Sequence, residues 1–141
     1  RIYETLAIVN HITNRFDCLA PKKKSIVFDR YWQFLSLLAT SIYPAYHRQH
    51  HSQYYVADNA CEQLRGRARS EQALVYDYIE GELNPFICED TLTAADFYLY
   101  MLTRWDLDKT RLRKNRPNLT FLIDTIKQMP SVSKVLQGQK N

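Results

Sequence analysis

The segment 92–102 constrains the fold of this chain more than any other. Asp96 is its one charged residue, in a run that is otherwise apolar and aromatic. Thr93 can cap a helix that starts there, and Asp96, three residues on, can reach back to the Thr93 amide as a capping box. Leu92 and Phe97 have the spacing of a hydrophobic staple. Because a helix that is apolar on all sides must be surrounded, the segment predicts a central helix with a buried acidic cap.

The composition agrees with one helical domain. The chain has 141 residues, of which 45% are hydrophobic and 24% charged, as in ordinary globular proteins. Its 3 glycines are few for hairpins and exclude a phosphate-binding loop. The 3 cysteines form no CxxC pair, which favours a reducing compartment over a disulfide framework. No apolar run approaches a membrane span and no signal peptide is present, so we expect a cytoplasmic, all-α protein.

Apolar spacing predicts where the helices lie. The strongest stripe runs from Phe28 to Tyr46, and Pro44 within it should kink the helix near Thr40 by removing an amide donor. Residues 17–25 contain Pro21 and three lysines and are expected to form a linker. No segment has the pattern of a strand. The predicted helices cover residues 3–16, 28–46, 57–80, 94–105, 117–128 and 131–137.

Four short motifs in this order resemble those of one known family. They are Glu4-Thr5-Leu6-Ala7-Ile8, Thr93-Ala94-Ala95-Asp96, Arg116-Pro117-Asn118-Leu119 and Met129-Pro130-Ser131-Val132. Through these four motifs together, the chain resembles the C-terminal helical domain of cytosolic glutathione transferases. The resemblance implies a helical bundle over residues 25–141, a linker at 17–24, and residues 1–16 as the last helix of a thioredoxin-like N-terminal domain.

The resemblance also implies a function. In that family the thioredoxin-like domain binds glutathione and activates its thiol, and the helical domain supplies most of the pocket for an electrophile. Glu4 and Thr5 match positions that hold the γ-glutamyl end of glutathione, the co-substrate. The residues expected near the small-molecule electrophile are Tyr43, Tyr46, His47, His50 and Trp105. The family usually forms homodimers.

Two qualifications belong to this implied function. The residue that activates the thiol would lie upstream of Arg1, so the chain by itself is not expected to be active. Helical domains of this type also serve as non-catalytic assembly modules, for example in translation factors and aminoacyl-tRNA synthetases. The sequence leaves a protein-interaction module as the alternative.

Other clusters have simpler interpretations. His47, His50 and His51 have helical spacing, but without a neighbouring Cys or an HExxH pattern a polar helix end is favoured over a metal site. The basic stretch 109–116 has no interleaved aromatics, so a solvated connection is favoured over nucleic-acid binding. Trp105 is assigned to core packing ahead of substrate stacking, and most of the 10 tyrosines to the core with their hydroxyls outward.

The first predicted helix carries more apolar side chains than one short element needs. Leu6, Ile8, Val9 and Ile12 give it a broad apolar face. We therefore expect part of that face to remain uncovered in this chain alone.

Overall fold

The computed structural model describes residues 1–139, and the part it describes contains helices and turns but no strand. Two isolated β-bridges occur in the loop before the central helix. The all-α prediction is confirmed. The helices are α1 (Thr5–Phe16), α2 (Ile26–Leu37), α3 (Tyr43–His50), α4 (Cys61–Glu82), α5 (Ala94–Thr103), α6 (Lys109–Arg113), α7 (Pro117–Lys127) and α8 (Pro130–Gly138), with a π-helical stretch η1 (Leu38–Ile42) and two short 3-10 turns, η2 (Ser52–Tyr54) and η3 (Asp58–Ala60).

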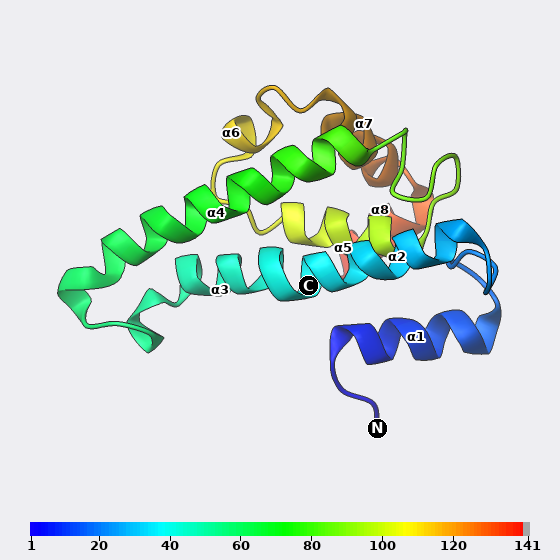
Figure 1. Cartoon of the computed structure of the whole chain (residues 1–141), viewed down its shortest axis with the longest axis horizontal. Helices are drawn as coiled ribbons and strands as arrows, with labels where there is room; N and C mark the ends of the chain where they lie inside the picture. Colours follow the sequence, from blue (N-terminus) through cyan, green and yellow to red (C-terminus); the bar gives the residue numbers. More distant parts are fainter. Residues whose placement is uncertain (140–141) are drawn as a thin grey trace.

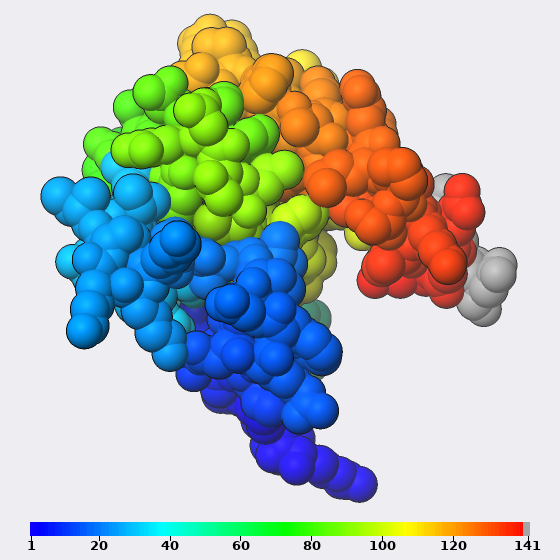
Figure 2. Space-filling view, turned by 90° about the vertical axis from the view of Figure 1, so that its right-hand side faces the viewer, coloured from blue at the N-terminus to red at the C-terminus, as the bar shows by residue number. Residues whose placement is uncertain are grey.

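The helices are arranged around α5. α2, η1 and α3 form one long rod that runs beside α4, while α5 lies between this pair and α7 (Figure 1). Ala95, Leu99 and Leu102 on α5 are completely buried. The predicted central helix is confirmed, and it ends at Thr103, slightly earlier than expected. α7 packs against α5 and α4, and α8 after it projects from the body of the molecule (Figure 2).

The amino end of α5 has the predicted capping box. Asp96 Oδ2 accepts hydrogen bonds from the amide and the hydroxyl of Thr93, both at 2.8 Å. Asp96 Oδ1 accepts a third from the Ile87 amide at 2.8 Å, which the sequence did not predict. Burial raises the pKa of Asp96, whereas these hydrogen bonds lower it. The carboxylate thus fixes both the start of α5 and the loop that leads into it.

An irregular stretch of helix precedes Pro44, close to the position at which a kink was expected. The rod continues through Pro44, and the five residues before Tyr43 form the π-helical stretch η1. Proline has no amide donor, and a π-helical turn accommodates it because its backbone is wider than that of an α-helix. Such a turn also rotates all residues that follow it. The rotation therefore sets which side chains of α3 face α4.

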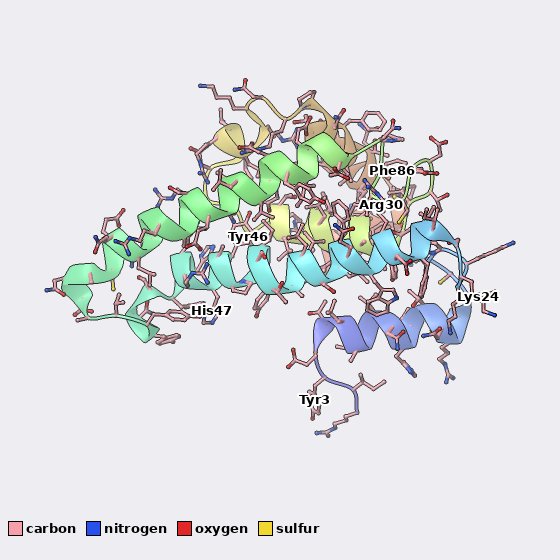
Figure 3. All side chains as sticks on the ribbon, viewed as in Figure 1. Tyr3, Lys24, Arg30, Tyr46, His47 and Phe86 are labelled. Atoms are coloured by element: carbon pink, nitrogen blue, oxygen red, sulfur yellow. The ribbon has the colours of Figure 1, made fainter. Side chains whose placement is uncertain are left out.

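α1 lies along α2 and is only partly covered (Figure 3). Leu6 and Val9 pack against the core. Ile8 and Ile12 are 40% and 41% exposed, and Phe16 is 64% exposed. The expectation that part of this apolar face remains uncovered is confirmed.

The basic stretch 109–116 is only in part the solvated connection that was expected. Arg113 forms two hydrogen bonds with the Asp124 carboxylate, at 2.8 and 3.0 Å. Arg116 is buried and donates to the Leu112 carbonyl at 2.8 Å and to Asp77 Oδ1 at 2.9 Å. The prediction therefore fails for Arg113 and Arg116, which bind carboxylates and a carbonyl within the molecule, whereas Lys109 and Lys114 are exposed as expected. Across residues 1–139, every helix is too short or too polar to cross a membrane.

Candidate functional site

Two adjoining hollows on one side of the molecule share Tyr43. The first, about 600 Å³, lies at the amino end of α1 and is lined by Glu4, Thr5, Tyr43 and Tyr98 among others. The second, about 640 Å³, lies between α3 and the end of α5, where Tyr43 and Trp105 form part of its wall. A ligand in either hollow would therefore contact the same tyrosine, and two ligands would lie close together.

Glu4 has an unusual backbone at the mouth of the first hollow. Its φ is 70°, in the left-handed region that non-glycine residues rarely adopt. Its carbonyl accepts a hydrogen bond from the Ile8 amide at 2.9 Å, so the strained residue is the N-cap of α1. Such strain costs about 1–3 kcal/mol and tends to occur at ligand sites. Thr5 follows it, and both residues are exposed.

Tyr98 forms the floor of the first hollow. It belongs to the central helix α5 and is almost completely buried. Burial raises the pKa of its hydroxyl, and the Thr5 side chain opposes that rise. Thr5 and Tyr98 both line this hollow.

Aromatic rings form the wall of the second hollow. The centroids of the Tyr43 and Trp105 rings are 5.6 Å apart. The Tyr46 ring contacts the Trp105 ring edge-on, with a centroid distance of 6.3 Å. Trp105 is 42% exposed, so its assignment to the core was wrong. The main reason is that α5 ends two residues before it, which carries the ring to the rim. His50 Nε2 lies 3.1 Å from the Trp105 carbonyl oxygen and ties this turn to α3.

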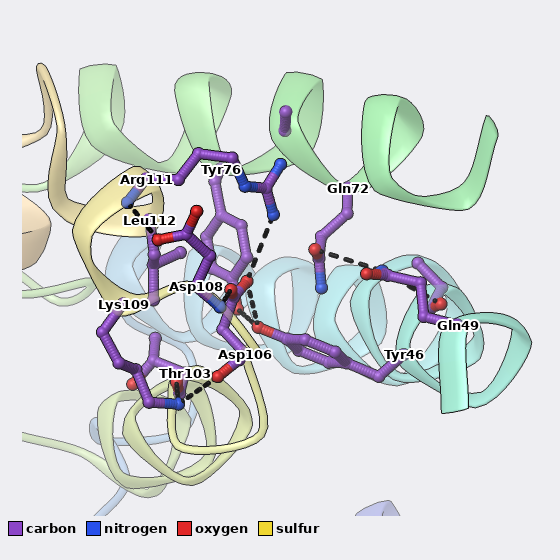
Figure 4. Close-up of polar contacts among 12 residues, drawn as sticks. Tyr46, Gln49, Gln72, Tyr76, Thr103, Asp106, Asp108, Lys109, Arg111 and Leu112 are labelled. Atoms are coloured by element: carbon purple, nitrogen blue, oxygen red, sulfur yellow. Dashed lines mark hydrogen bonds and ion pairs between the residues drawn. The ribbon is translucent and has the colours of Figure 1, made fainter. Parts of the chain in front are cut away.

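Tyr46 lies behind this wall and does not line the hollow. It is 1% exposed, and its hydroxyl lies 3.0 Å from the Tyr76 hydroxyl and 3.1 Å from Asp106 Oδ2 (Figure 4). Burial, followed by the influence of Tyr76 and Asp106, raises the pKa of Tyr46 far above its ordinary value. The expectation that buried tyrosines direct their hydroxyls outward was wrong for this pair. Figure 3 shows Tyr46 on the side of α3 that faces α4.

The structure therefore brings together four of the five residues expected near the electrophile: Tyr43, His47, His50 and Trp105. His51 also lines the hollow, and its ring stacks on Tyr54 at 5.5 Å. His47 Nδ1 lies 2.7 Å from the Tyr55 hydroxyl. In the described part of the chain no group of three or more His, Cys, Asp or Glu side chains could hold a metal ion.

A network of hydrogen bonds around the buried Asp106 supports the turn that carries Trp105, and this network was not predicted from the sequence. Asp106 is 5% exposed and accepts a hydrogen bond from the Asp108 amide at 2.8 Å. Lys109 Nζ donates to the carbonyls of Thr103 at 3.0 Å and Arg104 at 2.6 Å. The sequence feature that could have predicted this network is Lys109, which follows a predicted helix end. Cations at such positions commonly bind the last carbonyls of the helix.

Comparison with known families identifies most of this helical region. Residues 47–139 match the family model described as glutathione S-transferase, C-terminal domain. Comparison of the sequence with those of curated proteins gives no significant match.

Solved structures share the fold over almost the whole chain. A glutathione transferase homologue from Sulfitobacter with bound glutathione superimposes with a TM-score of 0.85 at 16% identity, covering 98% of this chain and 68% of that one. A beta-class glutathione S-transferase of Sphingomonas chungbukensis gives 0.77 at 21% identity, with coverages of 97% and 67%. A sphingomonad glutathione S-transferase complexed with glutathione gives 0.78 at 20% identity, with coverages of 99% and 68%.

Proposed function

Because the chain belongs to the glutathione S-transferase family through that family's C-terminal domain, we propose that it serves as the electrophile-binding part of a glutathione transferase. In the conjugation reaction the glutathione thiolate attacks an electrophilic atom and forms a carbon–sulfur bond. The leaving group departs with its bonding electrons, or the electrons move to a neighbouring atom that is then protonated. The thiolate is the reactive form, so the thiol proton must be lost first.

The pair of hollows that share Tyr43 is the observation that carries the proposal. A transferase must hold two substrates side by side so that their reacting atoms meet. We assign glutathione to the hollow at Glu4 and Thr5, and the electrophile to the hollow at Trp105. The strained backbone of Glu4 supports the first assignment, because strain of this kind persists where a site requires it.

The proposed roles follow from chemistry as well as position. The Glu4 carboxylate can bind the ammonium of the γ-glutamyl group, and the Thr5 hydroxyl with the start of α1 can bind its carboxylate. Tyr43 and Trp105 offer flat apolar surfaces to an aromatic electrophile. Tyr46 supports Trp105 from behind and is not assigned to substrate contact.

The remaining assignments rest on the family. We propose that residues 1–16 are the last helix of a thioredoxin-like domain, that residues 17–24 link it to the helical domain, and that residues 25–141 form that domain. The residue that activates the thiol then belongs to the thioredoxin-like domain. A cytoplasmic homodimer is the proposed state of the whole protein.

Retention on immobilised glutathione tests the proposal, measured for this chain and for any longer protein that contains it. The longer protein should bind glutathione and conjugate it to 1-chloro-2,4-dinitrobenzene, with release of chloride. Glu4→Gln and Thr5→Val should each lower glutathione retention at least about fivefold, since each removes one polar contact.

Asn14→Ala supplies the matched control, because Asn14 is exposed on α1 away from both hollows. A longer protein that neither binds glutathione nor conjugates the aryl halide, but binds another protein tightly, would instead identify a non-catalytic interaction module.

A further inference from the structure

We propose that the hollow at Trp105 selects aromatic electrophiles that carry an anionic substituent, such as a carboxylate. This inference rests on the proposed function and adds the class of the second substrate. It depends on which side chains line this hollow and on the hydrogen bonds and ion pairs that their charged groups already form within the protein.

One wall of the hollow suits a flat ring. Tyr43 and Trp105 lie with their rings inclined at 58°, and Leu107 beside them is 71% exposed. Exposed aromatic and aliphatic surface of this kind gains free energy when an aromatic ligand covers it. The wall is held in place by the His50 contact with the Trp105 carbonyl.

The rest of the lining is rich in basic side chains. His47, His50 and His51 come from the end of α3, while Arg104 and Lys109 come from the end of α5 and the start of α6. Lys109 uses its ammonium group on backbone carbonyls, so it contributes charge rather than a contact.

Arg104 lines this hollow and also the hollows beside α7 and α8, and its side chain makes fewer hydrogen bonds within the described residues than that of Lys109. It is exposed, and within residues 1–139 its guanidinium makes one hydrogen bond, from Nη1 to Gln139 Oε1 at 3.3 Å. A guanidinium has five donors in a planar fork, which matches the two oxygens of a carboxylate. The remaining donors of Arg104 are thus available to an anionic substituent.

The single carboxylate in the lining does not cancel this charge. Asp106 is 5% exposed, and its oxygens accept hydrogen bonds from the Tyr46 hydroxyl and the Asp108 amide. Arg111 Nη2 lies 3.6 Å from the same carboxylate and neutralises it from the protein side. An anionic ligand in the hollow therefore meets a cationic rim, with the one negative charge facing inward and paired.

In the reaction itself the anionic group is a spectator. The thiolate attacks a ring carbon that carries a halide, the carbon–sulfur bond forms, and the halide leaves with the electron pair of the broken carbon–halogen bond. The substituent only orients the ring, through Arg104, so that this carbon faces the glutathione hollow.

Calorimetric titration of the 141-residue chain with 3,5-dinitrobenzoate and its neutral amide, 3,5-dinitrobenzamide, tests the inference. Neither probe has a leaving group and neither needs glutathione, so the result is independent of whether the protein is a transferase. We expect the benzoate to bind about fivefold more tightly than the amide. Arg104→Gln should reduce that preference to less than about twofold, and Trp105→Leu should weaken both probes.

Arg67→Gln is the matched control, since Arg67 is exposed on α4 and lines neither hollow; the preference for benzoate should persist in it. Three results would overturn the inference: equal affinity for the two probes, no measurable binding of either, or a preference that survives Arg104→Gln. Thermal melting of each variant checks that it is folded.

Discussion

At the residue scale, the Asp96 side chain joins the start of the central helix to the loop before it. Its two carboxylate oxygens accept three hydrogen bonds, two from Thr93 and one from Ile87, in a site shielded from water. A buried amide that loses its acceptor costs about 1–3 kcal/mol. The position thus stabilises α5 through donors on the preceding loop as well as through the cap.

Replacing Asp96 with alanine is therefore expected to lower the free energy of unfolding by about 3 kcal/mol, because the amides of Ile87 and Thr93 lose their acceptor. Urea unfolding followed by circular dichroism measures the loss. Asp90→Ala, at an exposed position in the same loop, should change stability by less than about 0.5 kcal/mol. An unchanged unfolding midpoint for Asp96→Ala would contradict a buried cap.

At the element scale, α1 is covered on one side only and carries apolar side chains on its uncovered side. Leu6 and Val9 face the core, whereas Ile8 and Ile12 are about two fifths exposed. An amphipathic helix is held mainly by its buried stripe, so residues on the uncovered side contribute little to folding. They do present an apolar surface to other molecules.

Substituting lysine for Ile12 is expected to leave the free energy of unfolding within about 0.5 kcal/mol and to reduce self-association of this chain. Val9→Lys should lose about 2 kcal/mol, since it removes a packed side chain and places a charge at the core. Urea titration and light scattering distinguish the two effects. Equal destabilisation by both variants would show that the two faces of α1 are equally buried.

At the scale of the whole molecule, side chains distant in the sequence hold the helices together. Glu80 on α4 accepts hydrogen bonds from the amides of Asn118 and Leu119 at 2.9 and 2.8 Å, which caps α7 from another helix. Arg30 on α2 donates to the Ile87 carbonyl at 2.6 Å and pairs with Glu82 at 2.7 Å. These contacts join elements that hydrophobic burial alone would leave free to slide.

Arg116 provides the clearest test of these long-range contacts. It joins α6 to α4, with its guanidinium bonded to the Leu112 and Ala73 carbonyls and to Asp77. Arg116→Met should lower the free energy of unfolding by about 2–3 kcal/mol, because two carbonyls lose a charged donor. Arg67→Met, at an exposed site on α4, should cost less than about 0.5 kcal/mol, and chemical denaturation compares the two. A small loss for Arg116→Met would mean that water replaces its contacts.

The sequence by itself determined the features that depend on neighbouring residues. The central helix, the Thr93–Asp96 cap and the partly uncovered face of the first helix all follow from short spacings, because helix periodicity and capping act within a few residues. The linker and the order of the helices were predicted for the same reason. The motifs in that order also indicated the family.

Only the tertiary structure decided which distant side chains meet. It placed Tyr46 behind Trp105 rather than in the hollow, joined it to Asp106, and paired Arg113 and Arg116 of the basic stretch with Asp124 and Asp77. Whether a polar side chain faces water or a partner depends on helix packing and on the rotation introduced by η1. These are set by contacts between residues far apart in the chain, which no local pattern encodes.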